Sequence, residues 1–391
     1  MQLALVSETY APEVNGVALT VQSLLQQLVA QGHRVCLSCP RPPVDPDERS
    51  FVHQQTPGRS LPWYPDLRFG WPAGRRLESL WREARVQGVY VATEGPLGDS
   101  ALRAARRLGL PVVTGFHTRF DEFLAHYGLG LLKPLGLRYL RAFHDRADAT
   151  LVPTRELQAF LQARGFSRVE LLRRAVDTAL FTPQRRSAAL RAKLGVADSQ
   201  LLVLAVGRIA PEKNFALAFA AFRAIRQRHP TARLVVVGDG PARAALMREM
   251  PEAVWTGMLS HAELAAHYAS ADLYLMPSLT ETFGNVTLEA MACGVDTLAF
   301  DYGAAREHLI DSENGWSVPF GDAAAYVRRA EAAADAVAGG RRLGPAARQT
   351  LLPLSPARVA ADLVELLVRL GARSERLAAS TPLNGVLGES P

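Results

Sequence analysis

Short apolar runs alternate with longer amphipathic stretches along most of this 391-residue chain. The short runs are rich in Val, Leu and Ala, whereas the longer stretches repeat apolar residues at the spacing of a helix. This alternation is typical of βα units, whose parallel strands form a sheet covered by helices. It continues to about residue 164 and restarts at residue 201, after a polar stretch at 183–199. The sequence therefore predicts an α/β protein with two doubly wound domains.

The predicted elements follow one another at short intervals. Strands are predicted at residues 2–7, 34–38, 88–92, 111–116, 149–153, 201–206, 232–237, 273–276 and 296–300. Helices are predicted at residues 19–31, 75–85, 100–108, 155–164, 215–228, 241–249, 261–268 and 286–293.

The polar stretch sets the domain limits. It predicts an N-terminal domain at 1–185 and a C-terminal domain at 186–354. A terminal helix is expected within 355–372, with Pro356 at its first position and Gly371 just past its end. This helix could pack back towards the N-terminal domain. Residues 380–391 carry turn formers and predict a loose tail.

Composition excludes several classes of protein. A hydrophobic content of 48% excludes disorder as the main state, and no apolar run approaches the roughly 20 residues of a membrane span. The N-terminus lacks the basic region and cleavage site of a secretion signal, which favours a cytoplasmic location. Three cysteines cannot form a disulfide framework. We expect Cys36 and Cys39 to be packing residues and Cys293 to be buried.

The positive charge lies in the first half of the chain. Residues 1–185 hold 23 Lys and Arg against 17 Asp and Glu, a net charge of +6, and the remainder is neutral. This excess suits an acidic ligand or an anionic membrane surface. No nucleic-acid-binding motif accompanies it, so nucleic acid is not an expected partner.

The segment 278–294 carries the strongest functional signal. A strand ending at Pro277 leads to Glu281, and a helix then begins near Asn285 and ends before Gly294. The amides at its start belong to Phe283, Gly284, Asn285 and Val286. Such amides bind anions at the carboxyl edge of a sheet, and Glu289, one turn in, can face the same crevice. This layout suits a diphosphate between two hydroxyl-rich groups; the alternative is a helix with two solvated glutamates.

A second segment supplies cations. Arg208 and Lys213 follow an apolar strand and could neutralise a leaving phosphate, although two solvated loop residues would look the same. Gly238 and Gly240 lie in a Gly-Asp-Gly-Pro turn where the backbone could approach a nucleotide, or where a tight turn is needed.

Two further loops lie in the first half. Asn15 and Gly16 follow the first strand, and Gly16 would allow a phosphate or sugar to approach the backbone. His117 and Asp121 follow a later strand; a lone His is usually structural, but its place at a strand's carboxyl end favours a site. Neither a G-x-G-x-x-G loop nor a Walker motif occurs.

These segments occur in the order of a known family. Asn15-Gly16-Val17, His117-Thr118, Gly207-Arg208 with Lys213, and the pair Glu281 and Glu289 resemble the retaining glycosyltransferases of family 4. The resemblance runs from Met1 to about Gly371. It implies the GT-B fold, two Rossmann-like domains facing a central cleft. Residues 93–98 and 282–291 are similar to those of bacterial GDP-mannose-dependent α-mannosyltransferases, with sulfoquinovosyl- and glucosyltransferases that make glycolipids as close relatives.

The resemblance implies roles for these residues. Glu281 would hold the donor sugar and Glu289 the nucleotide ribose, while Arg208 and Lys213 would bind the diphosphate. The backbone amides of Gly16 and of residues 283–286 would also bind the diphosphate.

The family pattern also implies contacts at the reacting end of the donor. His117 would lie near the anomeric centre, and Asp121 would be an acceptor-side candidate. Two departures from the family pattern put local backbone shape in question: Asp296 stands where the family commonly has proline, and Ala175 precedes Val176-Asp177 where it has glycine.

The resulting hypothesis is a retaining hexosyltransferase. It would move mannose from GDP-mannose, its co-substrate, to a hydroxyl of a lipid, lipid-linked or glycan acceptor. Because cations and amides can stabilise the leaving diphosphate, we expect no metal and no cofactor. The Asp45-Pro46-Asp47 motif lies in a proline-rich loop and is not expected to bind metal.

The acceptor side rests on weaker signals. Trp63 and Tyr64 lie in an aromatic loop, and the basic helices near 75–85 and 131–146 could rest on anionic lipid. This predicts peripheral attachment to the cytoplasmic face of a membrane; the alternative is ordinary core-facing helices with solvated arginines. Other functions left open are a UDP-sugar-dependent glucosyl- or sulfoquinovosyl-glycolipid synthase, a GT-B nucleotide-sugar epimerase and a non-catalytic binding module.

Overall fold

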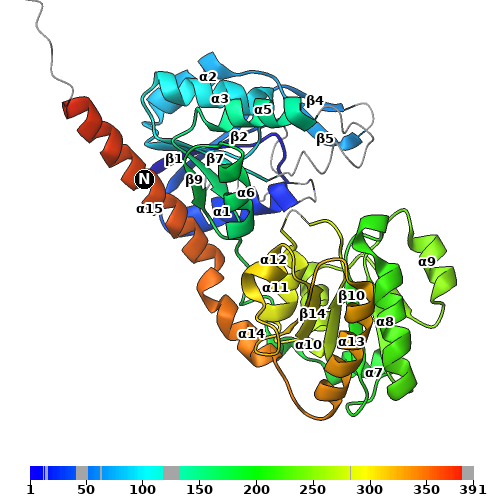
Figure 1. Ribbon diagram of the computed structural model, residues 1–391. Coiled ribbons are helices and arrows are strands. Elements are labelled where there is room, and N and C mark those ends of the chain that lie inside the picture. The colour runs from blue at the N-terminus through cyan, green and yellow to red at the C-terminus, as the bar shows by residue number, and fades with distance from the viewer. Residues whose placement is uncertain are drawn as a thin grey trace, which may run out of the picture. The chain divides into compact units, whose positions relative to one another are not determined.

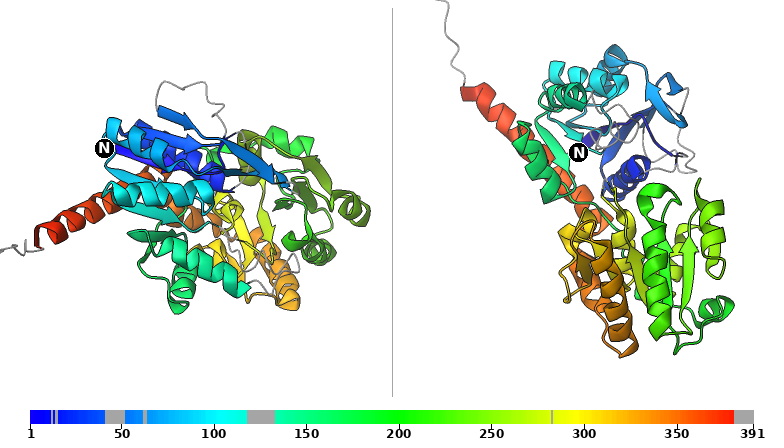
Figure 2. Two further views of the ribbon diagram at one scale, coloured as in Figure 1. Left: turned by 90° about the horizontal axis from the view of Figure 1, so that it is seen from above. Right: turned by 45° about the vertical axis from the view of Figure 1, so that its right-hand side comes forward.

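The sheet of the N-terminal part is built around the first strand of the chain. The computed structural model describes residues 1–11, 13, 16–40, 52–61, 64–117, 133–281 and 283–380. The chain divides into an N-terminal unit, formed by Met1–Arg173 and the segment from Pro356 onward, and a C-terminal unit, Arg174–Ser355. Each unit has its own parallel sheet with helices on both faces (Figures 1 and 2).

In the described part of the N-terminal unit, seven parallel strands have the order β3-β2-β1-β6-β7-β8-β9. They are β1 (Gln2–Val6), β2 (Arg34–Cys39), β3 (Val52–Gln55), β6 (Gly88–Val91), β7 (Val112–Gly115), β8 (Ala149–Val152) and β9 (Val169–Leu171). The helices are α1 (Gly16–Ala30), α2 (Gly74–Glu83), α3 (Pro96–Arg107), α5 (Lys133–His144), α6 (Arg155–Ala163) and α15 (Pro356–Ser380). An antiparallel hairpin of β4 (Gly58–Leu61) and β5 (Tyr64–Gly70) completes it.

The C-terminal unit repeats this plan with the strand order β12-β11-β10-β13-β14-β15. Its strands are β10 (Leu202–Val206), β11 (Arg233–Val237), β12 (Val254–Gly257), β13 (Leu273–Met276), β14 (Asp296–Phe300) and β15 (Trp316–Val318). Its helices are α7 (Ala188–Lys193), α8 (Phe215–Arg228), α9 (Arg243–Glu249), α10 (His261–Ser270), α11 (Asn285–Ala292), α12 (Ala304–His308), α13 (Ala323–Ala338) and α14 (Gly344–Leu351), with short 3-10 turns η2 (Pro183–Arg185), η3 (Pro211–Lys213) and η4 (Leu352–Leu354).

Two hydrophobic cores enclose the C-terminal sheet. Leu202 and Leu204 face one core with α10, α11 and α14, whereas Val203 and Ala205 face the other with α8 and α13. Successive residues of a strand point to opposite faces, so burial of both faces explains why these strands are continuously apolar. The strand order reverses between β10 and β13, where ligands of such folds bind.

The division between the units lies earlier than the predicted boundary after Arg185. Val176 and Phe181 are buried in the core of the C-terminal unit, and the Val176 amide donates to the Leu354 carbonyl over 3.0 Å. The apolar side chains that precede the polar stretch therefore join residues 174–185 to the second sheet.

The terminal helix is longer than predicted. α15 begins at Pro356 but continues through Gly371 to Ser380, because the residues after the glycine are good helix formers that outweigh its cost of about 1 kcal/mol. It packs on α1, where Gln31 donates to the Ala357 carbonyl over 2.7 Å. Residues 381–391, most of the predicted tail, lie outside the described part.

Asp296 explains one departure from the family pattern. Its carboxylate, at the start of β14, accepts hydrogen bonds from the amides of Leu343 and Gly344 over 3.0 and 2.9 Å. These amides lie at the start of α14, so the carboxylate satisfies donors that the helix leaves unpaired. Asp296, which stands where the family commonly has proline, therefore fixes the start of α14 beside the sheet. Cys36, Cys39 and Cys293 are free and buried, as expected.

Glu8 joins two loops of the N-terminal unit. Its carboxylate follows β1 and accepts a hydrogen bond of 2.9 Å from the Leu97 amide at the start of α3. A Cβ on Gly95 would lie 1.9 Å from this carboxylate, so the glycine permits the approach. Burial, opposed by the α3 amides and reinforced by Glu94, raises the pKa of Glu8 to about 7.

We expect Glu8→Gln to remove part of the pH dependence of stability. Because the folded pKa of about 7 exceeds the ordinary value of 4.5, the stability that Glu8 contributes is present below pH 4.5 and is lost as the pH rises through 7. The free energy of unfolding of the wild type, relative to the variant, should fall by about 3 kcal/mol over this range. Urea denaturation between pH 4.5 and 8 measures it, and parallel profiles would contradict the raised pKa.

Candidate active site

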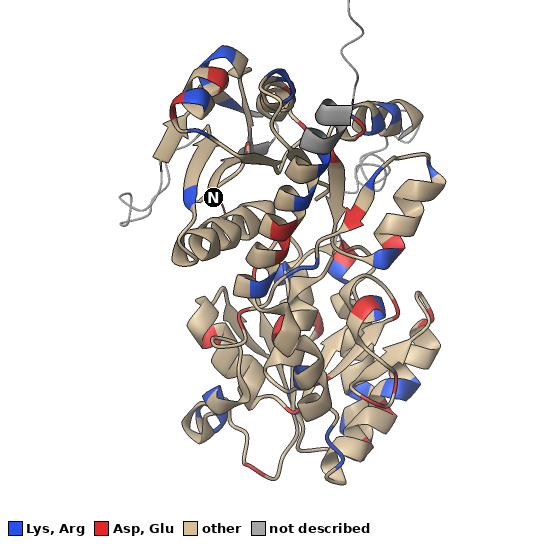
Figure 3. Ribbon diagram, turned by 90° about the vertical axis from the view of Figure 1, so that its left-hand side faces the viewer, with Lys and Arg blue, Asp and Glu red and all other residues tan. Residues whose placement is uncertain are grey.

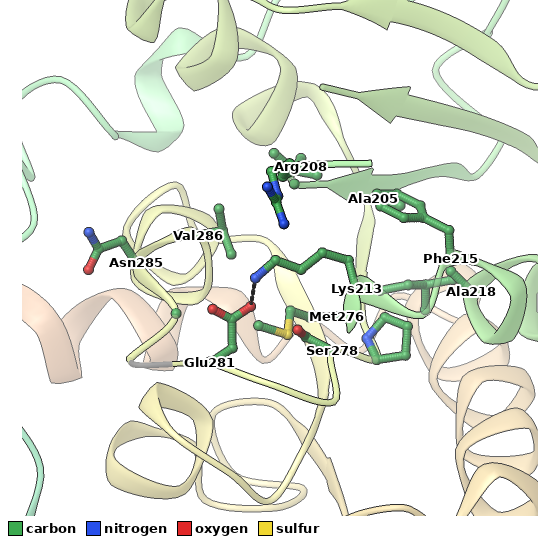
Figure 4. A pocket seen from close by; sticks show the side chains of 15 residues that line it. Ala205, Arg208, Lys213, Phe215, Ala218, Met276, Ser278, Glu281, Asn285 and Val286 are labelled. Atoms are coloured by element: carbon green, nitrogen blue, oxygen red, sulfur yellow. Dashed lines mark hydrogen bonds and ion pairs between the residues drawn. The ribbon is translucent and has the colours of Figure 1, made fainter. Parts of the chain in front are cut away.

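A pocket opens in the C-terminal unit where β10 and β13 end, at the reversal of strand order. Its volume is about 240 Å³. The loop after β10 contributes Arg208 and Lys213, and the segment after β13 contributes Glu281, Asn285 and Val286. Figure 4 shows the two cationic side chains pointing into the same space, with Glu281 across from Lys213. The predicted convergence of Arg208, Lys213 and the start of the 281–289 segment on one pocket is therefore observed.

The loop after β10 is held in place by Asn214. This residue has a left-handed φ of 54° and begins α8, and its side-chain amide donates to the Pro277 carbonyl over 3.2 Å. The Leu279 amide donates to the Glu212 carbonyl over 2.9 Å. These bonds join the ends of β10 and β13 and place Lys213, on η3, opposite the second loop.

Lys213 and Glu281 form the central contact of the pocket. The Lys213 Nζ atom lies 2.5 Å from Glu281 Oε1. The side chains are 20% and 12% exposed, so the pair is partly shielded from water but can be reached by a ligand. Arg208 pairs with Glu212 over 2.7 Å while its side chain stays 67% exposed, and its guanidinium can therefore turn to an anion at little cost.

The start of α11 closes the other side. Gly284 takes a left-handed φ of 96° just before the helix, and a Cβ there would lie 3.4 Å from the Met276 Cε atom and 3.5 Å from the Glu281 Cγ atom. The first amides of a helix have no acceptor within it, and Gly284, Asn285 and Val286 line the pocket. These amides provide an anion-binding end beside two cations.

Two predicted donor-site residues have other surroundings. Phe283 is buried, and its carbonyl accepts from the Ala304 amide over 2.7 Å. Glu289 was expected to face the same crevice, but it is not among the residues that line the pocket. Its Oε2 atom is enclosed without a hydrogen-bond partner, although Glu289 lies one turn after Asn285 on the same face of α11.

Gly238 and Gly240 are required by packing. A Cβ on Gly238 would lie 2.0 Å from the Gly207 carbonyl oxygen, and one on Gly240 would lie 2.4 Å from that of Ile209. The turn after β11 is thus in backbone contact with the loop that carries Arg208. The need for a tight turn, one of the two predicted explanations, is therefore observed, and the approach of a nucleotide to this turn stays a prediction.

The other predicted residues belong to the N-terminal unit. His117 follows β7, and its Nε2 atom lies 2.6 Å from the Tyr90 hydroxyl; a Cβ on Gly115 would clash with both groups. Gly16 is the first residue of α1, with open space around its α-carbon. Asn15, Asp121 and Trp63 lie outside the described residues, and only the backbone of Tyr64, in β5, is described.

Two residues that support the site were not predicted from the sequence. Glu212, four residues after Arg208, pairs with it, and this spacing on a Pro-Glu-Lys turn was a usable signal. The Tyr302 hydroxyl donates to the Glu281 carbonyl over 3.2 Å from a separate loop, and no local pattern indicates that contact.

The described residues lack two features, a metal-binding cluster and a membrane-spanning helix. No group of three or more His, Cys, Asp or Glu side chains there is arranged to hold a metal ion, and Asp45 and Asp47 fall outside that part. Within the same residues, no helix combines the length and hydropathy that a membrane span requires.

Comparison with known proteins places the chain among enzymes. A model of Glycosyltransferase Family 4 matches residues 14–180, and one of Glycosyl transferases group 1 matches residues 200–335. A GDP-mannose-dependent alpha-mannosyltransferase of Mycobacterium tuberculosis is 35% identical over 329 residues, 82% of this chain and 85% of the relative. An alpha-monoglucosyldiacylglycerol synthase of Streptococcus pneumoniae is 27% identical over 318 residues, 76% of this chain and 71% of the relative.

A solved structure supports the predicted fold. Anabaena HepE in complex with UDP matches with a TM-score of 0.75 at 17% identity, covering 94% of this chain and 100% of that one. The two parallel sheets and this match confirm the GT-B fold. The chain is 35% identical to a mannosyltransferase over 82% of the length of this chain. It therefore belongs to the family 4 glycosyltransferases and is a hexosyltransferase.

Proposed function

We propose that this enzyme transfers mannose from GDP-mannose to a hydroxyl of a lipid, lipid-linked or glycan acceptor, with retention and without a metal ion. The observation that carries the proposal is the pocket in which Arg208, Lys213, Glu281 and the start of α11 converge. Relatives named GDP-mannose-dependent alpha-mannosyltransferases, 35% and 36% identical to the chain, support the choice of donor.

The pocket has the parts that departure of a diphosphate requires. Negative charge develops on the leaving group, and Lys213, the α11 amides and an Arg208 guanidinium that can turn towards it would stabilise that charge. Glu281 would accept hydrogen bonds from hydroxyls of the sugar and hold its ring. A leaving phosphate oxygen can take the acceptor's proton, so the chemistry needs no protein nucleophile. His117 and Gly16 remain proposed donor contacts from the N-terminal unit.

Lys213 has two partners in this mechanism. In the free enzyme it neutralises Glu281, and in the complex it would also face the diphosphate. Donor binding therefore exchanges a compact ion pair for a network of carboxylate, ammonium and phosphate. Such a network keeps the ammonium satisfied on both sides and orients it toward the bond that breaks.

A nucleotide panel tests the donor and the metal together. We expect GDP to raise the melting temperature more than UDP or ADP, since a ligand that binds the folded state stabilises it by RT ln(1 + [L]/Kd). The shift should be the same with magnesium and with EDTA. Stabilisation by UDP alone would favour the glucosyl- or sulfoquinovosyltransferase alternative, and a strict magnesium requirement would contradict the metal-free mechanism.

Lys213→Ala and Glu281→Gln should each lower kcat by about 100-fold, because each removes a contact worth roughly 3 kcal/mol in the transition state. The double variant should lose less than the product of the two effects, since the residues act on one another. Lys193→Ala, which removes an exposed lysine on α7, is the matched control. Mannosyl transfer within a few-fold of the wild-type rate in either single variant would refute the assigned roles.

We further propose that α5 contacts an anionic membrane where the acceptor is a lipid. Leu135 and Tyr139 are 65% and 52% exposed, and Arg138 and Ala142 are exposed on the same face of the helix. This combination suits an interfacial helix. The helix α2 differs, because its apolar residues Leu77 and Trp81 are buried in the core. The alternative of an ordinary core-facing helix therefore applies to its apolar face. Figure 3 shows Lys and Arg interspersed with Asp and Glu rather than forming one basic face.

Flotation with vesicles containing anionic lipid tests this contact. The wild type should float at low salt, and Leu135→Ser with Arg138→Ser should abolish flotation, because both the apolar area and the charge are removed. Val368→Ser, at an apolar residue of α15 that is 51% exposed, should float like the wild type. Binding that is insensitive to salt, or unchanged in the α5 variant, would contradict the proposal.

A further inference from the structure

The side chain of Glu289 is partly exposed, but one of its carboxylate oxygens is enclosed by the protein. The residue as a whole is half-buried, yet its Oε2 atom is enclosed and has no hydrogen-bond partner. Burial raises the pKa of this carboxyl group to about 7. A buried charged oxygen without a donor is unfavourable, so this atom requires an explanation that packing alone does not give.

Tyr268 lies on α10, which packs against α11. Tyr268 is fully buried, and its hydroxyl also lacks a hydrogen-bond partner. The hydroxyl lowers the pKa of Glu289, against the larger effect of burial, and burial, with the nearby Tyr274 and Glu289 side chains, raises the pKa of Tyr268. The two groups are therefore close but do not meet hydrogen-bond geometry in the free protein.

The ring of Tyr268 is fixed, so the hydroxyl has a defined direction. It packs edge-on against Tyr274, with ring centroids 5.5 Å apart, and against Phe181 at 6.2 Å. The hydroxyl of Tyr274 donates to the Val206 carbonyl at 3.4 Å. Two aromatic neighbours thus fix the ring of Tyr268, whose hydroxyl lies near both the Tyr274 hydroxyl and the Glu289 carboxylate and forms no regular hydrogen bond with either.

Other titratable groups near α11 have separate roles. Cys293, directly after α11, is a buried thiol whose pKa burial raises to about 12. From α14, Arg348 donates to the carbonyls of Phe181, Ala292 and Thr178. From α12, the ring of His308 packs on Phe283 at 6.2 Å. The pKa of Glu289 is set by burial and by Tyr268.

We propose that Tyr268 is a positioning residue for nucleotide binding: its hydroxyl donates to Oε2 of ionised Glu289 and directs the other carboxylate oxygen to the ribose hydroxyls. This inference rests on the proposed function, in which Glu289 binds the ribose. A small rotation of Glu289 would pair both unpartnered groups when the ligand binds. Protonated Glu289 accepts fewer hydrogen bonds, so binding should weaken as the pH falls.

The test is the pH dependence of GDP affinity, measured by calorimetry from pH 5.5 to 8.5. In the wild type, Kd should rise on the acid side as Glu289 takes up a proton, with a midpoint near pH 7. Tyr268→Phe should raise Kd about 10-fold at pH 7 and move the midpoint to higher pH, because the hydroxyl no longer stabilises the carboxylate. Glu289→Gln should remove the rise of Kd at acidic pH.

Tyr326→Phe is the matched control. Tyr326 is a buried tyrosine of the same unit whose hydroxyl donates to the Leu298 carbonyl over 3.0 Å. Its loss should lower the melting temperature but leave the midpoint of the Kd profile unchanged. A merely structural role of Tyr268 would give this same result, so an unmoved midpoint in Tyr268→Phe overturns the proposal.

Two further measurements separate the possible failures. In the Glu289→Gln background, Tyr268→Phe should cost no additional affinity, and an equal loss there would also overturn the proposal. Glu289→Asp keeps the charge but withdraws it from the hydroxyl, and should move the midpoint in the same direction even if Tyr268→Phe does not fold. If the wild type binds none of GDP, UDP and ADP, the proposed function itself fails.

Discussion

The ion pair between Lys213 and Glu281 connects loops that lie 68 residues apart in the sequence. It depends on the parallel pairing of β10 with β13, which brings the ends of both strands to one edge of the sheet. In the free protein each charge satisfies the other, so the pocket can hold a cation beside a helix N-terminus without a ligand. The remaining site elements are arranged around this pair: Arg208 on one loop and the α11 amides on the other.

Much of this arrangement could be predicted because it follows from local patterns. Alternation of apolar and amphipathic segments indicates which residues form strands, and polar residues directly after a strand indicate the edge where Arg208, Lys213 and Glu281 would meet. The pairing of Lys213 with Glu281 was not predicted, since both were assigned to a ligand. A buried charge that binds a ligand needs another partner when the ligand is absent, so a nearby residue of opposite charge could have been expected from the sequence.

Other features depend on contacts that no local pattern records. Gly238 and Gly240 suggest either a ligand approach or a tight turn, and only the structure shows that the backbone of Gly207 and Ile209 leaves no room for a side chain at either position. Gly371 looks like a helix end, yet the chain beyond it continues α15. In both cases the glycine indicates either that a side chain would not fit or that the backbone needs conformational freedom. Only the residues around it in the folded protein determine which of the two applies.

Glu8 and Glu289 show how the fold accepts buried carboxylates for different reasons. The pKa of each is about 7, so ionising either at neutral pH opposes folding. Glu8 is compensated by the amides of α3 and connects two loops, which is a structural role. Glu289 has an enclosed oxygen without any donor, although glutamine would relieve the charge at similar volume. An uncompensated carboxylate within a well-packed helix is expected where ligand binding, rather than folding, determines the residue, and this favours a binding role for Glu289 even though it does not line the pocket.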